Sequence, residues 1–149
     1  MSLTVYQQHV NDWQDCRRCS LWSTRKHVVL ARGKLPCTVL VIGESPGKSE
    51  NLLGQPFVGP AGQQLDYIIQ QALINSGKTL RIAWTNIIAC IPIGEEGTKT
   101  EEPPKEAIDK CAPRLKELVR IAQPKLIVVA GKLAKKHVVG QAQFCEEGE

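Results

Sequence analysis

The fold is decided by residues Thr38–Gly62, which read TVLVIGESPGKSENLLGQPFVGPAG. They open with an apolar, β-branched run, Thr38–Ile42, which predicts a buried strand. A Gly/Pro loop, Gly43–Gly47, follows it, and a second such loop carries the aromatic residue Phe57. Open α/β sheets place their binding sites where buried parallel strands end in exposed loops. This stretch therefore predicts a ligand site at the carboxyl edge of a sheet.

The rest of the chain alternates between strands and helices. Two further apolar runs, Arg81–Ala89 and Lys125–Ala130, predict two more buried strands. Apolar residues at helical spacing predict helices over Thr4–Asp15, over Gln63–Asn75, after Pro103-Pro104, and over Lys132–Val139. This order predicts a single α/β domain over residues 1–149, with three layers and a central parallel sheet flanked by helices.

Proline and glycine mark the expected interruptions of this pattern. Residues Gly33–Pro36 are expected to form a turn before the first buried strand. Pro113 lies within the third expected helix and lacks the N–H that would bond to the carbonyl of Asp109. We therefore expect a kink or a break between two short helices there.

The composition is ordinary, but the positive charge is concentrated in one segment. Of the 149 residues, 42% are hydrophobic, and no apolar run approaches the roughly 20 residues of a membrane helix. The N-terminus has no basic start followed by an apolar core, which predicts an intracellular, cytoplasmic protein. Basic residues cluster between Cys16 and Lys34, where the candidate phosphate contacts are Arg17, Arg18, Arg25 and Lys26. Charge alone would favour a solvated face over a binding surface.

Four of the six cysteines form a candidate metal or cluster site. Cys16 and Cys19 have the C-x-x-C spacing that lets two thiolates reach one metal centre. Cys90 follows a predicted strand, and Cys111 lies on a helix face that should return to the same edge. Four thiolates suit a [4Fe–4S] cluster or a structural zinc ion. Most zinc ribbons have a second C-x-x-C pair, and its absence here favours an iron–sulfur cluster over a zinc ion.

Other uses of the cysteines are weaker. A disulfide framework is unexpected in an intracellular chain. A thioredoxin-like redox pair would need the C-x-x-C motif at the end of a strand, whereas here it follows a polar, helical segment. The remaining cysteines are expected to be small buried hydrophobic residues: Cys37 and Cys145.

The loop after the first buried strand is close to a nucleotide-binding P-loop and has to be distinguished from one. Residues 43–49, GESPGKS, match G-x-x-x-x-G-K-[ST] with one residue missing. Loop length decides whether the backbone N–H groups can wrap a phosphate, and Pro46 removes one of those groups. The third strand also ends without an acidic residue for Mg²⁺. A nucleotide site is therefore disfavoured.

A different set of side chains at this edge suits a planar heterocycle. Glu44 and Asn86 come at or near the carboxyl ends of two predicted strands, so they should share one edge of the sheet. Phe57 lies in a loop stiffened by neighbouring prolines and glycines. The ring can stack on a base, the amide can read an N–H/C=O edge, and the carboxylate can hold a water. Taken singly, each residue is explained as readily by a core, turn or solvated position.

Together these motifs resemble those of the iron–sulfur uracil-DNA glycosylases, family 4 of that superfamily. The matching pieces are Cys16-Arg-Arg-Cys19, Gly43-Glu-Ser-Pro-Gly47-x-x-Glu50, Gly54-Gln-Pro-Phe57-Val-Gly-Pro-Ala-Gly62, Thr85-Asn86-x-x-x-Cys90, a cysteine before Pro113, and Pro124-Lys-x-Ile-Val. The resemblance implies a uracil-DNA glycosylase fold and a nucleoid-associated hydrolase that excises uracil from DNA in base excision repair. It also implies a [4Fe–4S] cluster on Cys16, Cys19, Cys90 and Cys111.

The resemblance also assigns roles within the cleft. It implies that Phe57 stacks on the extruded uracil and that Asn86 pairs with the edge of the base. Glu44 and Ser45 would position the water or stabilise the departing base. Further substrate contacts by the same carry-over are Gly43, Gly47 and Glu50.

Departures from the family pattern keep a second interpretation open. Ser45 stands where family 4 usually has alanine, and the loop between Cys90 and Cys111 is somewhat longer than usual. The chain ends before the family's fourth strand and its histidine loop, and His137 is followed by Val138 rather than proline. The alternative is a non-catalytic glycosylase-fold protein that keeps the cluster and the DNA surface and serves as a binding or interaction subunit.

The same departure predicts a truncated sheet. The last expected strand, Lys125–Ala130, would then have an open apolar edge, which is an aggregation hazard. We expect a protein partner, a second copy of the chain or the acidic tail to cover that edge.

Overall fold

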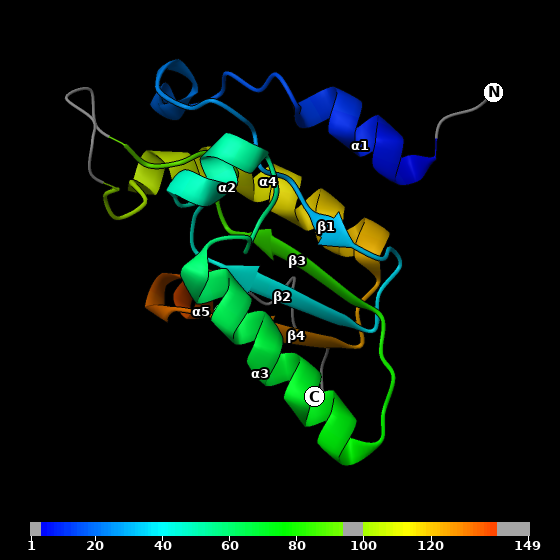
Figure 1. Ribbon diagram of the computed structural model, residues 1–149. Helices are drawn as coiled ribbons and strands as arrows, with labels where there is room; N and C mark the ends of the chain where they lie inside the picture. The colour runs from blue at the N-terminus through cyan, green and yellow to red at the C-terminus, as the bar shows by residue number, and fades with distance from the viewer. Residues whose placement is uncertain (1–3, 94–99, 140–149) are drawn as a thin grey trace.

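A mostly parallel sheet forms the centre of the molecule. The computed structural model describes residues 4–93 and 100–139. Within them, one sheet has the strand order β1-β3-β2-β4 (Figure 1), the strands being β1 (Arg32–Gly33), β2 (Val39–Gly43), β3 (Ile82–Asn86) and β4 (Leu126–Val129). β2 pairs in parallel with both β3 and β4, and β1 pairs antiparallel with β3. The predicted three-strand parallel sheet and the α/β class are confirmed, with one short antiparallel strand added.

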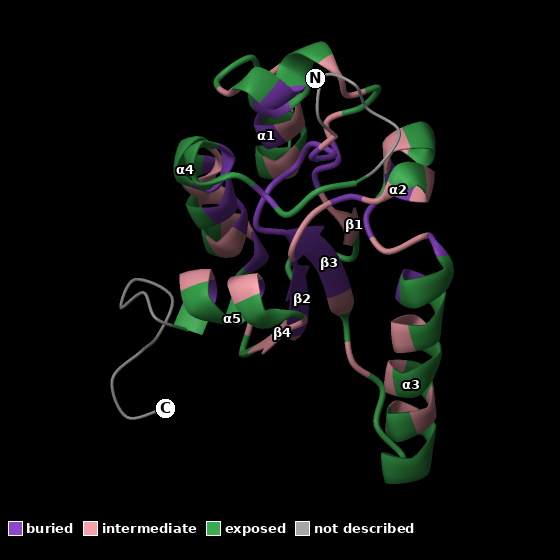
Figure 2. Cartoon of the chain, turned by 90° about the vertical axis from the view of Figure 1, so that its left-hand side faces the viewer, coloured by how far each residue is buried: buried purple, intermediate pink, exposed green. Residues whose placement is uncertain are grey.

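The helices of the described residues lie on both sides of this sheet. They are α1 (Val5–Trp13), α2 (Lys48–Leu53), α3 (Pro60–Ser76), α4 (Lys105–Ala122) and α5 (Lys132–Val139), with a short 3-10 turn, η1 (Ser20–Ser23). Figure 2 shows β2 and β3 between α4 on one side and α3 on the other, and in Figure 1 α1 lies beyond α4. None of these helices is long and apolar enough to cross a membrane.

Strand β2 divides the core between the two helical layers. Leu40 and Ile42 pack in one cluster with residues of α4 and α5. Val39 and Val41 pack in another, with Trp84 and residues of α3. Successive side chains of a strand point to opposite faces, so the fully apolar sequence of β2 covers both. This burial fixes β2 at the centre of the sheet and places its carboxyl end between two neighbouring strands.

Strand β1 shortens the turn expected at Gly33–Pro36, because Gly33 belongs to the strand and the chain bends at Leu35 and Pro36. Gly33 has a φ of 102° and is paired with Ala83 of β3. A Cβ at Gly33 would collide with the backbone oxygen of Ile82. The close approach of two backbones therefore depends on this glycine, and sequence patterns do not register such a contact. Arg32, the other residue of β1, is carried to the edge of the site described below.

Two helix predictions also differ from the structure. The break expected at Pro113 is wrong, because α4 runs through this proline as one helix. Its apolar side is buried through Leu115 and Leu118, and that burial outweighs one lost backbone hydrogen bond. Helix α2 was missed: it occupies part of the expected loop and ends at Gly54, whose φ is 81°.

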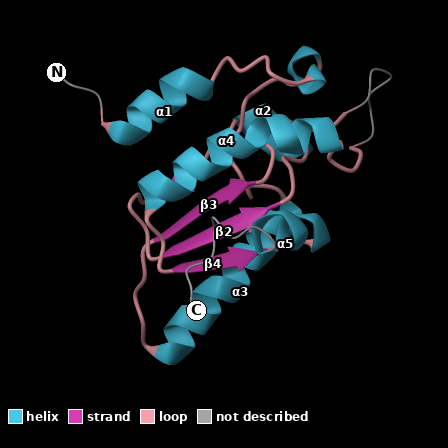
Figure 3. Cartoon of the chain, turned by 180° about the vertical axis from the view of Figure 1, so that it is seen from behind, coloured by secondary structure: helices cyan, strands magenta, loops and turns pink. Residues whose placement is uncertain are grey.

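The remaining expectations concern chain segments near the sheet edges. Cys37 is a small buried core residue as predicted, whereas Cys145 and the acidic tail lie outside the described residues. β4 is the last strand of the described sheet, and Leu126 is 57% exposed. β3 ends at Asn86, earlier than expected, and residues 87–91 continue as buried coil. In Figure 3, seen from behind, the parallel strands point toward α2 and α5, so the carboxyl edge lies at that end.

Candidate functional site

An open cleft of about 710 Å³ lies at the carboxyl edge of β2 and β3. It brings together the residues that the sequence analysis placed there: Gly43, Glu44, Ser45, Gly47, Glu50, Phe57 and Asn86. The convergence follows from the topology, because the carboxyl ends of adjacent parallel strands meet at one edge.

The Phe57 ring and the Asn86 carboxamide meet over Gly43. A Cβ at Gly43 would lie 2.5 Å from Phe57 Cζ and 2.6 Å from Asn86 Oδ1, so only glycine leaves room for both groups. The N–H of Ile87 donates to the carbonyl of Gly43 at 2.8 Å, which continues the β2–β3 pairing and holds Asn86 in place. Asn86 is only 3% exposed, and among the described residues Arg114 bonds to its backbone carbonyl while no side-chain hydrogen bond involves its carboxamide. It is therefore available to a ligand in the cleft.

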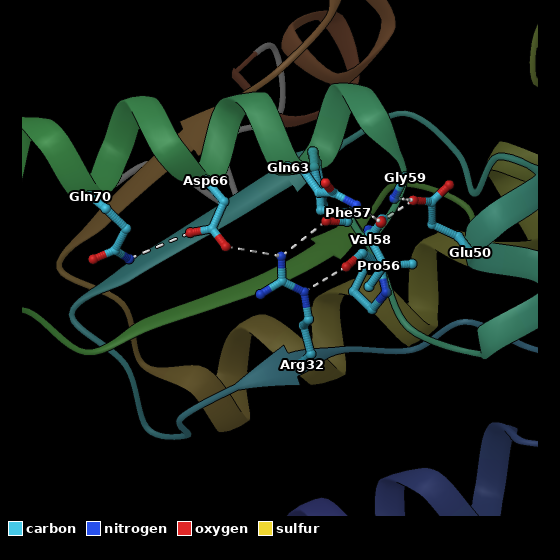
Figure 4. Close-up of polar contacts among 9 residues, drawn as sticks. All are labelled: Arg32, Glu50, Pro56, Phe57, Val58, Gly59, Gln63, Asp66 and Gln70. Atoms are coloured by element: carbon cyan, nitrogen blue, oxygen red, sulfur yellow. Dashed lines mark hydrogen bonds and ion pairs between the residues drawn. The ribbon is translucent and has the colours of Figure 1, made fainter.

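Phe57 has a backbone conformation that aromatic residues rarely adopt. Its φ is 59°, in the left-handed region, which costs about 1–2 kcal/mol for a residue with a Cβ. Arg32 holds this conformation: Nε donates to the carbonyl of Pro56 at 2.6 Å, and Nη2 donates to that of Phe57 at 3.1 Å (Figure 4). The guanidinium also lies 4.6 Å from the Trp84 ring, which packs 5.1 Å from the Phe57 ring. Strained residues held by their surroundings are typical of functional sites.

Glu50 ties the two loops of the cleft together. Its side chain is buried and accepts a hydrogen bond from the backbone N–H of Gly47. It also accepts from the backbone N–H groups of Val58 and Gly59 (Figure 4). A carboxylate that accepts several backbone N–H bonds fixes the positions of those groups firmly. Glu50 was assigned as a substrate contact. The structure places its carboxylate within the loop scaffold, while the residue still borders the cleft.

Glu44 connects the cleft to α5. Its Oε2 accepts the backbone N–H of Leu133 at 3.1 Å, in the first turn of that helix. A negative charge is favourable at a helix N-terminus, so this contact orients the carboxylate. Gly131 leaves the room for it, because a Cβ there would overlap the Glu44 side chain. Ser45 follows Glu44 along the rim, half-buried.

The four candidate ligand cysteines line one small cavity behind the cleft. Cys90 is buried, and the thiols of Cys16, Cys19 and Cys111 are half-buried. Burial raises the pKa of the Cys90 thiol to about 12, although Arg25 beside the cavity acts in the opposite direction. Burial also raises the pKa of Cys19. Among the described residues, no three His, Cys, Asp or Glu side chains lie close enough to hold a single metal ion.

The candidate phosphate contacts are spread over the surface beside this cavity. Arg17 lies 4.6 Å from the ring of Trp22, and Arg18 lies 4.2 Å from the ring of Trp13. Both arginines are exposed, as is Lys26, whereas Arg25 is half-buried at the cavity wall. In this basic segment, Arg17 and Arg18 are therefore held against tryptophan rings and Arg25 against the cavity wall.

A comparison with protein families identifies the fold. The model of the uracil DNA glycosylase superfamily matches residues 31–148. This chain belongs to that superfamily. The match includes every predicted residue of the cleft and begins after Cys16 and Cys19.

Individual glycosylases of the superfamily are similar over most of the chain. A Type-4 uracil-DNA glycosylase of Sulfurisphaera tokodaii is 32% identical over 123 residues, which cover 83% of this chain and 53% of the relative. One from Pyrobaculum aerophilum is 31% identical, covering 83% and 59%. One from Archaeoglobus fulgidus is 28% identical, covering 87% and 61%. The chain thus spans between half and two thirds of the length of these relatives.

Two residues near the cleft were missed by the sequence analysis. Arg32 was counted only as a member of the basic segment, and its contacts depend on the unexpected strand β1. Arg114 lies on α4 between Cys111 and Leu118, on the buried side of the helix. A charged residue within an apolar stripe is a signal that could have singled it out.

Proposed function

We propose that the protein excises uracil from DNA by hydrolysing the N-glycosidic bond, in base excision repair. The observation that carries this proposal is the convergence of the Phe57 ring and the unpartnered Asn86 carboxamide over Gly43. An open cleft lined by backbone suits a flat base rotated out of a nucleic-acid strand. Membership of the superfamily and the similarity to Type-4 uracil-DNA glycosylases support the choice of base.

The cleft residues divide the recognition of uracil between them. Phe57 stacks on the face of the extruded base, with its ring held from behind by Trp84. The Asn86 carboxamide presents a donor and an acceptor side by side, which complement the O4 and N3–H of uracil. Because the carboxamide is not committed elsewhere among the described residues, it loses no internal hydrogen bond when the base binds.

Glu44 and Ser45 act on the water and the sugar. The bond between C1′ and the base nitrogen breaks, and its electron pair leaves with uracil. Water adds to C1′ and gives its proton to the Glu44 carboxylate, while Ser45 contributes a further hydroxyl to the water. The charge of Glu44 also stabilises the cationic sugar, and electrostatic stabilisation of this kind is usually the largest catalytic term.

The activity is tested with a uracil-containing oligonucleotide, followed by alkali cleavage of abasic sites. We expect cleavage by the wild type and a loss of about 10²–10³-fold in Asn86→Ala, the range for one transition-state contact. Gln64→Ala, on the exposed side of α3, is the matched control and should remain active. Binding of the oligonucleotide without cleavage would refute the enzyme and support the non-catalytic DNA-binding alternative.

We further propose that Cys16, Cys19, Cys90 and Cys111 hold a [4Fe–4S] cluster. Support comes from their position around one cavity and from the arginines beside them. A four-iron cluster takes one thiolate on each iron and so spaces its ligands more widely than a single zinc ion does. When bound, the cluster would crosslink the segment after α1, the segment after β3, and α4. Iron and acid-labile sulfide analysis of anaerobically purified protein tests this assignment, and zinc without iron would contradict it.

The basic segment is proposed as the DNA-contacting surface, through Arg17, Arg18, Arg25 and Lys26. Each phosphate contact that is lost should reduce the slope of log K against log salt by about 0.9 for duplex DNA. Arg17→Gln is therefore expected to lower this slope by about that amount, whereas the exposed control Lys78→Gln should leave it unchanged. Equal slopes for both variants would contradict the proposal.

Two further proposals concern the setting of the protein. We propose that it acts inside the cell, on the DNA of the nucleoid, because its proposed substrate is there. We also propose that the outer edge of β4, where Leu126 is exposed, pairs with another protein chain or with a second copy. Light scattering of the purified protein should show a dimer if the edge pairs with itself. A monomer at all concentrations would exclude pairing with a second copy and leave pairing with another protein chain.

A further inference from the structure

One fully buried charge lies between the cleft and the cysteine cavity. Arg114 of α4 is 1% exposed. Its Nε donates to Cys111 Sγ at 3.1 Å, its Nη1 to Thr85 Oγ1 at 3.2 Å, and its Nη2 to the carbonyl of Asn86 at 2.6 Å. A single side chain therefore contacts one candidate cluster ligand and the backbone of the residue that faces uracil.

Among the described residues, no carboxylate forms an ion pair with Arg114. A buried, uncompensated guanidinium is strongly unfavourable, and proteins keep buried charges where an opposite charge is close. Of the side chains in residues 4–93 and 100–139 that accept a hydrogen bond from Arg114, the Cys111 thiol is the one that becomes anionic when it ligates a metal. The buried arginine thus fits an anionic cysteine site and supports the assignment of a cluster to it.

Hydrogen bonds to the backbone on two sides fix the position of Asn86, and Arg114 makes one of them. On one side, the N–H groups of Ile87 and Ile88 donate to the carbonyls of Gly43 and Glu44 at 2.8 and 3.2 Å. On the other side, Arg114 holds the carbonyl of Asn86.

Thr85 is fixed in turn, because its hydroxyl donates to the carbonyl of Leu30 at 2.6 Å. Four residues after Asn86 the chain reaches Cys90, a second candidate ligand. The segment between cleft and cavity is short and tied at both ends.

We propose that Arg114 is a positioning residue that couples occupancy of the cysteine site to the geometry of Asn86. This inference rests on the proposed function of the cleft and of the cysteines. Ligation would fix the position of the Cys111 sulfur, which accepts the Nε hydrogen bond, and so would keep the guanidinium against the carbonyl of Asn86. A vacant site no longer holds the Cys111 sulfur in place against the guanidinium. The Arg114 contacts then weaken, and the segment after β3 opens more readily.

Hydrogen exchange of the anaerobically purified, iron-loaded protein tests the coupling. The probe is deuterium uptake in a peptide covering residues 85–91, before and after iron is removed with an oxidant and a chelator. The variants are Arg114→Met, Arg114→Lys and, as matched control, Arg120→Met, which removes an exposed arginine from the same helix. Iron content and kcat and KM on uracil-DNA are measured on the same samples.

In the wild type and in Arg120→Met, iron removal should speed exchange of residues 85–91 by about tenfold or more, the effect of losing a charged hydrogen bond. Iron-loaded Arg114→Met should already exchange at the faster rate and respond little to iron removal. If this variant does not fold or does not hold iron, Arg114→Lys provides the test. Lysine keeps the charge but cannot reach all three acceptors of Arg114, so the iron-loaded variant should exchange faster than the iron-loaded wild type.

Slow, wild-type exchange in an iron-loaded Arg114 variant would overturn the coupling. The coupling would also be overturned if exchange of residues 85–91 in the wild type did not change on iron removal, or if the wild type held no iron. The exchange readout does not depend on turnover. An inactive protein with the expected exchange pattern therefore refutes only the glycosylase proposal, and an active protein without the pattern refutes only the coupling.

Discussion

The cleft and the cysteine cavity are neighbours that are stabilised in opposite ways. The loops of the cleft are held by charged side chains bonded to backbone: Glu50 accepts three N–H groups, and Arg32 donates to two carbonyls. The cavity has four thiols, and burial favours the neutral form of Cys90. This difference teaches that hydrogen bonds within the chain already organise the cleft, whereas, under the proposed assignment, the cavity would change its charge when a ligand replaces the thiol protons.

The strongest test of the organised cleft is the removal of Glu50. Glu50→Ala leaves three inward-facing N–H groups without their acceptor, and we expect a loss of about 3–5 kcal/mol in the free energy of unfolding. Urea denaturation measures it, with the exposed Glu102→Ala as control. Equal stability of both variants would mean that water replaces the carboxylate and that the cleft is less organised than described.

A methyl group at Gly43 should disturb the cleft without disturbing the cavity. In Gly43→Ala the new Cβ displaces the Phe57 ring or the Asn86 amide. A displacement of about 1 Å at a catalytic group can reduce the rate by about 10²-fold, which we expect in kcat/KM on uracil-DNA. Iron content should stay at the wild-type level. Ser49→Ala, on the rim of the same cleft, is the control, and unchanged activity in Gly43→Ala would refute the role of the two groups.

Arg32 tests whether the strained Phe57 is held from outside its own loop. Arg32→Lys keeps the positive charge but cannot make both backbone contacts, so we expect a loss of about 1–2 kcal/mol in stability and about tenfold in kcat/KM. The control is Lys34→Met, at a nearby exposed position, which should change neither the stability nor kcat/KM. A rate loss without a change in KM would indicate that the Phe57 ring is misplaced in the transition state rather than in binding.

The smallest expected effect concerns the helix that backs the cavity. His9 is buried, its Nδ1 lies 2.6 Å from Glu117 Oε1, and its Nε2 has no partner among the described residues. Burial lowers the pKa of His9 below its ordinary value of 6.5, against the opposing effects of Glu117 and Asp12, while Arg114 adds to the lowering.

The unfolded chain then binds the proton more readily than the folded one, so stability is present above about pH 6.5 and is lost as pH falls toward the folded pKa. We expect this loss in wild-type protein and its absence in His9→Gln, measured by thermal unfolding from pH 7.5 down to 5. The half-buried His137→Gln serves as control. An identical pH profile for His9→Gln and wild type would contradict the lowered pKa.

Much of the cleft was predictable because it follows from a local rule. Glu44, Phe57 and Asn86 were expected together because buried parallel strands end at a common edge. The four cysteines were grouped by the same argument, and they line one cavity. The helix through Pro113 was not predictable, because its continuity depends on how much apolar surface the rest of the fold buries.

By itself, the sequence determined the alternation of the three parallel strands with the longer helices, the buried centre of the sheet and the side chains at its carboxyl edge. Hydrophobic period and Gly/Pro placement carry that information, and both are local. Only the tertiary structure decided that Arg32 supports Phe57 and that Arg114 bridges Cys111 and Asn86. These contacts join residues that are distant along the chain, and no sequence period records them, because they depend on how separate elements pack.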